Sequence, residues 1–152
     1  MSFWSSMKIG ASGLAAQQLR LDVISNNIAN ADTTHTAQGG PYQRQDVVFT
    51  SNGTPAFQPL LGAAVNGQFG RPQLAETGVQ VSRIVTDTTP GAQVYDPQNP
   101  DADANGNVTY PNVDIATEMT NMISATRSYE ANLAVIEAVK RMALKALDMG
   151  AK

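Results

Sequence analysis

Residues 112–150 read NVDIATEMTNMISATRSYEANLAVIEAVKRMALKALDMG. Apolar residues return there at intervals of three and four, which is the spacing of one face of an α-helix. The members of this stripe are Ile115, Met119, Met122, Tyr129, Leu133, Ile136, Ala143 and Leu147. Asp114 precedes the stripe with a side-chain acceptor suited to capping a helix, and Gly150 follows it as a natural stop. The sequence therefore predicts a long C-terminal helix.

A shorter stripe with a heptad-like pattern lies near the other end of the chain. It consists of Leu14, Leu21, Ile24, Ile28 and Ala31, separated by seven, three, four and three residues. The pattern predicts a helix from about residue 5 to residue 31. Gly10 and Gly13 fall inside it, and each weakens a helix by about 1 kcal/mol relative to Ala. A helix of this kind needs apolar surface from another segment to be stable.

Proline separates the two stripes. All eight prolines lie between Pro41 and Pro111, and nine of the twelve glycines lie between residues 39 and 106. Since proline removes a backbone donor and breaks helix interiors, the middle of the chain is not helical. Alternating patterns predict strands at residues 42–49, 79–86, 92–95 and 108–110, while residues 51–78 resemble a long flexible loop.

We therefore predict an α+β fold in which long N- and C-terminal helices pack together as a coiled-coil-like domain. Residues 1–33 and 112–152 would form this discontinuous helical domain. Residues 34–111 would form a small, β-rich and loop-rich middle segment.

The composition restricts the classes of partner. Only 15% of the residues are charged and 42% are hydrophobic, so uncharged polar residues are unusually common. Such surface is cheaper to bury against other protein than charged surface, which hints at a polymer or complex. The net charge is −3 and the ten basic residues are scattered, which argues against nucleic acid as a partner. The absence of cysteine excludes disulfides and thiolate sites.

No segment predicts membrane insertion or a cleaved signal peptide. No stretch approaches the roughly 20 apolar residues that span a bilayer. Residues 1–16 are interrupted by Gly10, Ser12 and Gly13, and Lys8 lies inside the apolar part and not before it. We expect no direct membrane insertion, and any export to use a route without a cleaved signal.

One loop has part of a calcium-binding pattern. Asp101, Asp103 and Asn105 place oxygen ligands at positions one, three and five of an EF-hand loop, and Gly106 follows at position six. Position twelve is Asn112 where a bidentate Glu is needed, and no helix precedes the loop. A polar turn between two short strands is the favoured interpretation. A weak cation site in a small calcium-binding, secreted interaction module is the alternative.

The sequence predicts neither an enzyme nor a cofactor. His35 is the only histidine, and no nucleophile or acidic partner has a recognisable motif near it. Phosphate-cradling loops and dinucleotide fingerprints are missing from the sequence. We expect no catalytic residue and no resident metal.

Two stretches resemble a known family. Residues 12–22 (SGLAAQQLRLD) and 25–33 (SNNIANADT) resemble the N-terminal signature of the flagellar rod and hook proteins. Residues 118–132 (EMTNMISATRSYEAN) resemble their C-terminal signature. Residues 41–44 (PYQR) ahead of VVF at 47–49 resemble the proximal rod members, and the resemblance covers nearly the whole chain.

The resemblance implies a structural subunit of the bacterial flagellar basal-body rod, the drive shaft that transmits motor torque to the hook. It implies export through the flagellar type III apparatus and a location in the rod that spans the periplasm. The implied partners are copies of this chain and other rod proteins. Another axial rod protein remains the nearest alternative.

The expected assembly interface combines the apolar stripes with signature positions of the family. Asn27, Asn30, Tyr129 and Asn132 enter it by resemblance. The full set is Leu14, Leu21, Ile24, Asn27, Ile28, Asn30, Met119, Met122, Tyr129, Asn132, Leu133 and Ile136.

Overall fold

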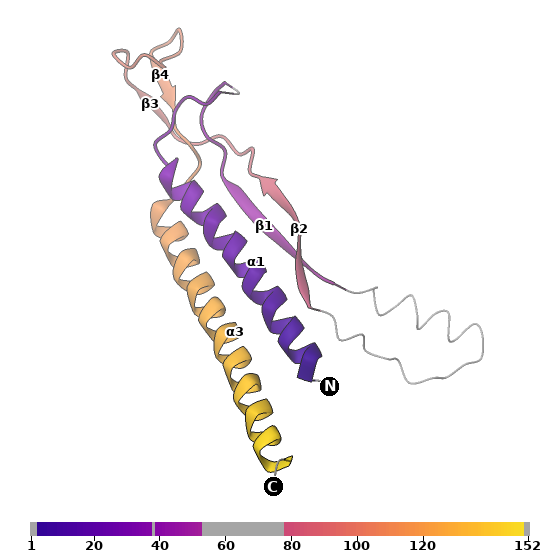
Figure 1. The fold of residues 1–152 in the computed structure, drawn as a ribbon. Coiled ribbons are helices and arrows are strands. Elements are labelled where there is room, and N and C mark those ends of the chain that lie inside the picture. The colour runs from indigo at the N-terminus through magenta and orange to yellow at the C-terminus, as the bar shows by residue number, and fades with distance from the viewer. Residues whose placement is uncertain (1–2, 38, 53–77, 151–152) are drawn as a thin grey trace, which may run out of the picture.

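Two antiparallel helices form the body of the molecule in the computed structural model, which describes residues 3–37, 39–52 and 78–150. In chain order the elements are α1 (Phe3–Ala29), β1 (Gln45–Ser51), β2 (Val79–Thr86), β3 (Gln93–Tyr95), β4 (Asn107–Thr109) and α3 (Ile115–Gly150). Figure 1 shows α1 between α3 and the β1–β2 hairpin, with the β3–β4 hairpin beyond the end of the helix pair that is opposite both termini. The predicted α+β fold is confirmed.

Helix α3 presents a regular seam of low exposure. Glu118, Ala125 and Val139 are buried. The positions that complete the seam are half-buried, namely Met122, Tyr129, Asn132, Ile136 and Ala143. Together these eight residues alternate spacings of four and three without a break, which is the heptad pattern of coiled coils. Several apolar members of the predicted stripe lie outside this seam, because Glu118, Ala125 and Asn132 occupy inner positions instead.

Two glycines allow the helices to approach closely. An added Cβ at Gly10 would lie 2.9 Å from Ile136 Cγ1, and one at Gly13 would lie 2.9 Å from Asn132 Nδ2. The helix-weakening glycines of the sequence are therefore contact positions, where the missing side chain makes room for α3.

Helix α1 extends from Phe3 to Ala29 and so begins and ends about two residues earlier than predicted. Side chains add hydrogen bonds at the C-terminal end of this helix. Asn30 Nδ2 donates to the carbonyl oxygen of Asn26 at 2.9 Å, and the Thr33 hydroxyl donates to Asn30 Oδ1 at 3.3 Å. The Asn26 carbonyl oxygen also accepts the Asn30 N–H at 3.1 Å, whereas the Ala31 N–H donates to Ile28 three residues back, so a turn replaces the helix before the predicted Ala31.

The β1–β2 hairpin differs from the predicted strands at one end. Strand β2 has the predicted bounds, and its antiparallel register pairs Gln45 with Thr86 and Ser51 with Val79. Residues 42–44 were predicted as strand but lie before β1, because Tyr42 and Arg44 turn their side chains toward the helices. Ser51 belongs to β1, and the rest of the predicted 51–78 loop lies outside the described residues except at its ends.

The polar turn between β3 and β4 is confirmed. Val94 pairs with Val108 in the antiparallel register, and Val108 is only 1% exposed. Gly106 has φ +79°, a left-handed conformation that glycine adopts without strain.

Asp114 caps α3 as predicted. Its Oδ1 accepts the Ala116 N–H at 3.1 Å, and its Oδ2 accepts the Thr117 hydroxyl at 2.6 Å. The bond from Thr117, followed by that from Ala116, lowers the pKa of Asp114 below its ordinary value. The charged cap thus also suits the positive end of the helix dipole.

The close approach of the helices predicts the effect of a larger residue at Gly13. Gly13→Leu should lower the free energy of unfolding by about 1–3 kcal/mol, since the new side chain must displace Asn132 and separate the helices. Ala11→Leu, on the exposed face of α1, is the matched control and should change it by less than about 0.5 kcal/mol. Urea unfolding of both variants measures the difference, and equal values would contradict the close packing.

Candidate functional site

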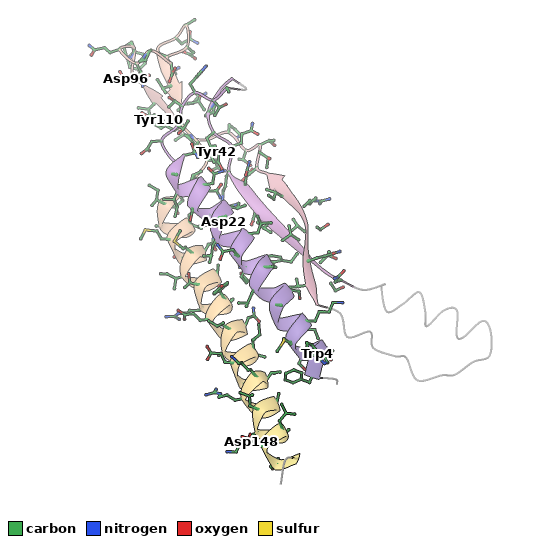
Figure 2. The ribbon with its side chains drawn as sticks, in the orientation of Figure 1. Trp4, Asp22, Tyr42, Asp96, Tyr110 and Asp148 are labelled. Atoms are coloured by element: carbon green, nitrogen blue, oxygen red, sulfur yellow. The ribbon has the colours of Figure 1, made fainter. Side chains whose placement is uncertain are left out.

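A polar cluster around two buried side chains lies where the C-terminal end of α1, the segment before β1 and the first turn of α3 meet. We call it the hub and define it as Asn27, Tyr42, Arg44, Gln45 and Glu118. Figure 2 shows Tyr42 at this end of the helix pair, beside the base of the β1–β2 hairpin. Asn27 is 0% exposed and Glu118 is 1% exposed, so neither side chain reaches water.

The Asn27 amide makes four hydrogen bonds, which is its full capacity. Its Oδ1 accepts the Tyr42 hydroxyl at 2.8 Å and the Gln45 N–H at 2.9 Å. Its Nδ2 donates to the Gln45 carbonyl oxygen at 2.8 Å and to Glu118 Oε2 at 3.2 Å. One side chain on α1 therefore attaches both the backbone of β1 and the start of α3.

The buried carboxylate of Glu118 is paired with Arg44. Arg44 Nε donates to Oε1 at 2.8 Å, and Nη2 approaches the same oxygen at 2.8 Å. The Arg44 side chain is 23% exposed and also lies 3.7 Å from Asp46. A buried carboxylate is tolerated only when it is paired and hydrogen-bonded, and both of its oxygens meet that condition here.

The hub changes the acidity of its cationic and phenolic members. Burial acts to lower the pKa of Arg44, but the hydrogen bond and negative charge of Glu118 outweigh it and raise the pKa above its ordinary value. Burial, followed by the charge of Glu118, raises the pKa of Tyr42. Arg44 thus stays charged and Tyr42 stays a neutral donor.

The outer side of α3 carries apolar side chains that nothing in the described chain covers. Ile115, Met119 and Ile123 are 44%, 55% and 55% exposed. Leu133 is 41% exposed, and further apolar residues follow toward the C-terminal end of the helix, namely Val135, Met142, Leu144, Leu147 and Met149. At 3.6 residues per turn, one side of the helix carries Ile115, Met119, Ile123, Leu133 and Leu144, and we call these five residues the outer apolar face. The other flank of the helix carries Val135, Met142 and Met149.

The last turns of α3 also extend beyond α1. The helices contain 36 and 27 residues, a difference of about 13 Å at 1.5 Å per residue. Since Gly10 approaches Ile136 in the antiparallel pair, the excess lies past the N-terminal end of α1. Figure 2 shows Asp148 farther along this direction than Trp4, which is itself 74% exposed.

The predicted interface residues are divided between these surroundings. Ile24 and Asn27 are buried inside the chain, while Met119 and Leu133 belong to the outer apolar face. The remaining eight are half-buried, namely Leu14, Leu21, Ile28, Asn30, Met122, Tyr129, Asn132 and Ile136. The structure therefore brings only part of the set onto one open surface.

The candidate cation loop uses its oxygens in other ways. Asp103 Oδ1 accepts the N–H groups of Asn107 and Asn105 at 2.9 and 2.8 Å, and these bonds lower its pKa. Asp101 Oδ2 accepts the Thr34 hydroxyl at 2.6 Å. Within residues 3–37, 39–52 and 78–150, no group of three or more acidic, His or Cys side chains is placed to hold a metal ion.

Sequence reasoning missed the hub as a unit. Arg44 and Glu118 are 74 residues apart, and each resembles an ordinary surface charge when its own segment is considered alone. The available signal was the seven-residue spacing of Glu118, Ala125 and Asn132, which places a carboxylate on the inner seam.

Comparison with known proteins finds relatives over nearly the whole chain. Residues 7–34 match the family model described as "Flagella basal body rod protein", and residues 104–149 match "Flagellar basal body rod FlgEFG protein C-terminal". The chain is 42% identical to the flagellar basal-body rod protein FlgC of Bacillus subtilis over 154 residues, covering 99% of both chains. The FlgC proteins of Borreliella burgdorferi and Salmonella typhimurium are 42% and 41% identical, with 97% and 99% of each chain covered. The chain belongs to the FlgC family of flagellar basal-body rod proteins.

As a member of the FlgC family, the chain is a structural subunit of the flagellar basal-body rod, and this family is not a family of enzymes. The two matched segments coincide with α1 and with the region from before β4 to α3. Asn27 lies in the first and Glu118 in the second, so the hub joins both. No helix in the described part of the chain has the length and apolar character required to cross a membrane.

The raised pKa of Tyr42 predicts how stability depends on alkaline pH. The unfolded chain loses the Tyr42 proton from about pH 10, whereas the folded chain retains it to a higher pH. The contribution is complete below the unfolded pKa and is lost as the pH rises through the folded pKa. The free energy of unfolding should therefore fall less steeply above about pH 10 in Tyr42→Phe than in the unaltered chain. Parallel slopes would contradict the raised pKa of the Tyr42 hydroxyl.

The geometry of the 101–107 loop predicts that calcium has no specific effect. Addition of about 1 mM calcium should leave the Tm unchanged relative to an equal concentration of magnesium. A saturable rise in Tm that disappears in Asp103→Asn would instead support a cation site.

Proposed function

We propose that this chain is a subunit of the proximal rod and that the outer apolar face of α3 is its principal contact with neighbouring subunits. The observation that supports this most is the exposure of Ile115, Met119 and Ile123 along one side of a helix whose other side is already paired with α1. A contiguous apolar helix face of this kind marks a protein contact in a subunit of a larger assembly.

The predicted interface residues fit this proposal to different degrees. Met119 and Leu133 are open to a partner, whereas residues such as Leu14 and Tyr129 are half-buried within the chain and only partly available. The overhanging end of α3 adds Leu147 and Met149, which are 70% and 73% exposed. We propose that copies of this chain and other rod proteins cover these positions. The helical residues 1–33 and 112–152 would then act as one discontinuous domain.

The mechanism that we propose is mechanical. Torque from the motor would pass to the hook through many parallel subunit contacts, so no individual site needs catalytic chemistry. About 25 cal/mol is gained for each Å² of apolar surface removed from water, and a helical array repeats this gain at every subunit. We propose that the chain catalyses no reaction and binds neither nucleic acid nor membrane.

We also propose that the chain reaches the periplasmic part of the rod through the flagellar type III export apparatus, without a cleaved signal peptide. The support is membership of a flagellar rod family.

The outer apolar face is tested by Leu133→Asp. The variant should abolish motility and incorporation into isolated basal bodies, because a carboxylate on this face loses hydration when a neighbour covers it. The free energy of unfolding of the isolated chain should change by less than about 1 kcal/mol, since Leu133 is 41% exposed. The variant should still be found outside the cytoplasm after fractionation.

Leu133→Met is the matched control, because it retains an apolar side chain of similar volume. It should preserve motility. Normal swimming by the Leu133→Asp strain would count against this face as an assembly contact, and retention in the cytoplasm would count against independent export.

A further inference from the structure

The hydrogen bonds of the hub are shared unequally between Asn27 and Glu118, and this bears on how the single chain folds. Asn27 makes three of its four hydrogen bonds with Tyr42 and Gln45, so α1 and the start of β1 can hold one another without α3. Glu118 has no comparable independence. Its two carboxylate oxygens rely on Arg44 and Asn27, and its side chain is 1% exposed.

The energetic consequence differs between the two partners of the ion pair. The Arg44 side chain is 23% exposed with α3 in place. It is therefore at least as well hydrated when α3 is absent, and Asp46 stays nearby. If Arg44 is not in place, docking α3 would bury an uncompensated carboxylate, which is among the most destabilising changes a core can suffer. The first turn of α3 therefore does not pack favourably against α1 until Arg44 is in place to pair with Glu118.

We propose that the hub is a one-way interlock, in which Glu118 makes docking of α3 conditional on prior attachment of residues 42–45 to Asn27. The joint between α1 and β1 forms first and presents Arg44. The helix pair then closes. Glu118 docks at the hub, and Gly10 and Gly13 allow α1 to approach α3 closely farther along the pair. The order also follows the direction of synthesis, because Glu118 lies 91 residues after Asn27. This inference concerns the folding of a single chain and does not depend on the assembly contact proposed above.

The interlock is tested by hydrogen exchange on the full-length chain, with the amides of residues 42–47 reporting on the joint and those of 118–125 on the docking of α3. Arg44→Met should accelerate exchange in 118–125 by about a hundredfold or more, while 42–47 stay within about tenfold of the unaltered chain. Asn27→Ala should accelerate both regions. Glu118→Gln should leave 42–47 protected, because the joint does not need the carboxylate.

The matched controls are Arg141→Met and Glu137→Gln, which make the same chemical changes at exposed positions of α3. Both should exchange like the unaltered chain. A double variant, Arg44→Met with Glu118→Leu, removes both charges and should restore protection of 118–125 to within about tenfold, even if Arg44→Met alone fails to fold.

Three results would overturn the interlock. One is an Arg44→Met variant that opens both regions equally or neither. Another is a double variant that is as open as Arg44→Met alone. The third is an unaltered chain whose amides in both regions exchange at the rate of an unfolded peptide.

Discussion

A carboxylate without access to water is the constraint on which the rest of this structure depends. Glu118 lies in the first turn of α3 and is paired with Arg44 and bonded to Asn27, from two other segments of the chain. Because a buried charge tolerates little misplacement, this contact defines the register of α3 against α1 and the position from which the β1–β2 hairpin leaves the helices. Other contacts, such as those of Gly10 and Gly13, then follow along the antiparallel pair.

The inward and outward sides of α3 carry different kinds of residue. Polar and small residues occupy much of the α3 seam that faces α1, and large apolar residues such as Met119 and Leu147 remain outside. This is the reverse of the usual distribution in a single domain. It is the distribution expected of a rod subunit whose apolar surface is completed by its neighbours, while a buried ion pair and an amide specify its own internal register.

Family membership and geometry support one another here. Among the described residues, the two fully buried polar side chains are Asn27 and Glu118, and each lies in one of the matched regions. Arg44, which neutralises Glu118, lies between those regions in the sequence. Asn27, which enters the expected interface by resemblance to the family signature, is completely buried inside its own chain and is therefore not open to a neighbouring subunit.

The sequence by itself determined the elements and their class. The spacing of apolar residues identified both helices, proline excluded helix from the middle, Asp114 marked the start of α3, and the bounds of β2 were correct. These features depend on neighbours within a few residues, where propensity and pattern decide the outcome. The tertiary structure alone decided which face of α3 turns inward, why glycine occupies positions 10 and 13 of α1, and why Tyr42 lies outside the strand. Those outcomes depend on contacts between segments far apart in the sequence, such as the pairing of the Arg44 guanidinium with the Glu118 carboxylate 74 residues away. Such a contact has no local signature, since each charge becomes costly to bury only after the chain has brought the other to it.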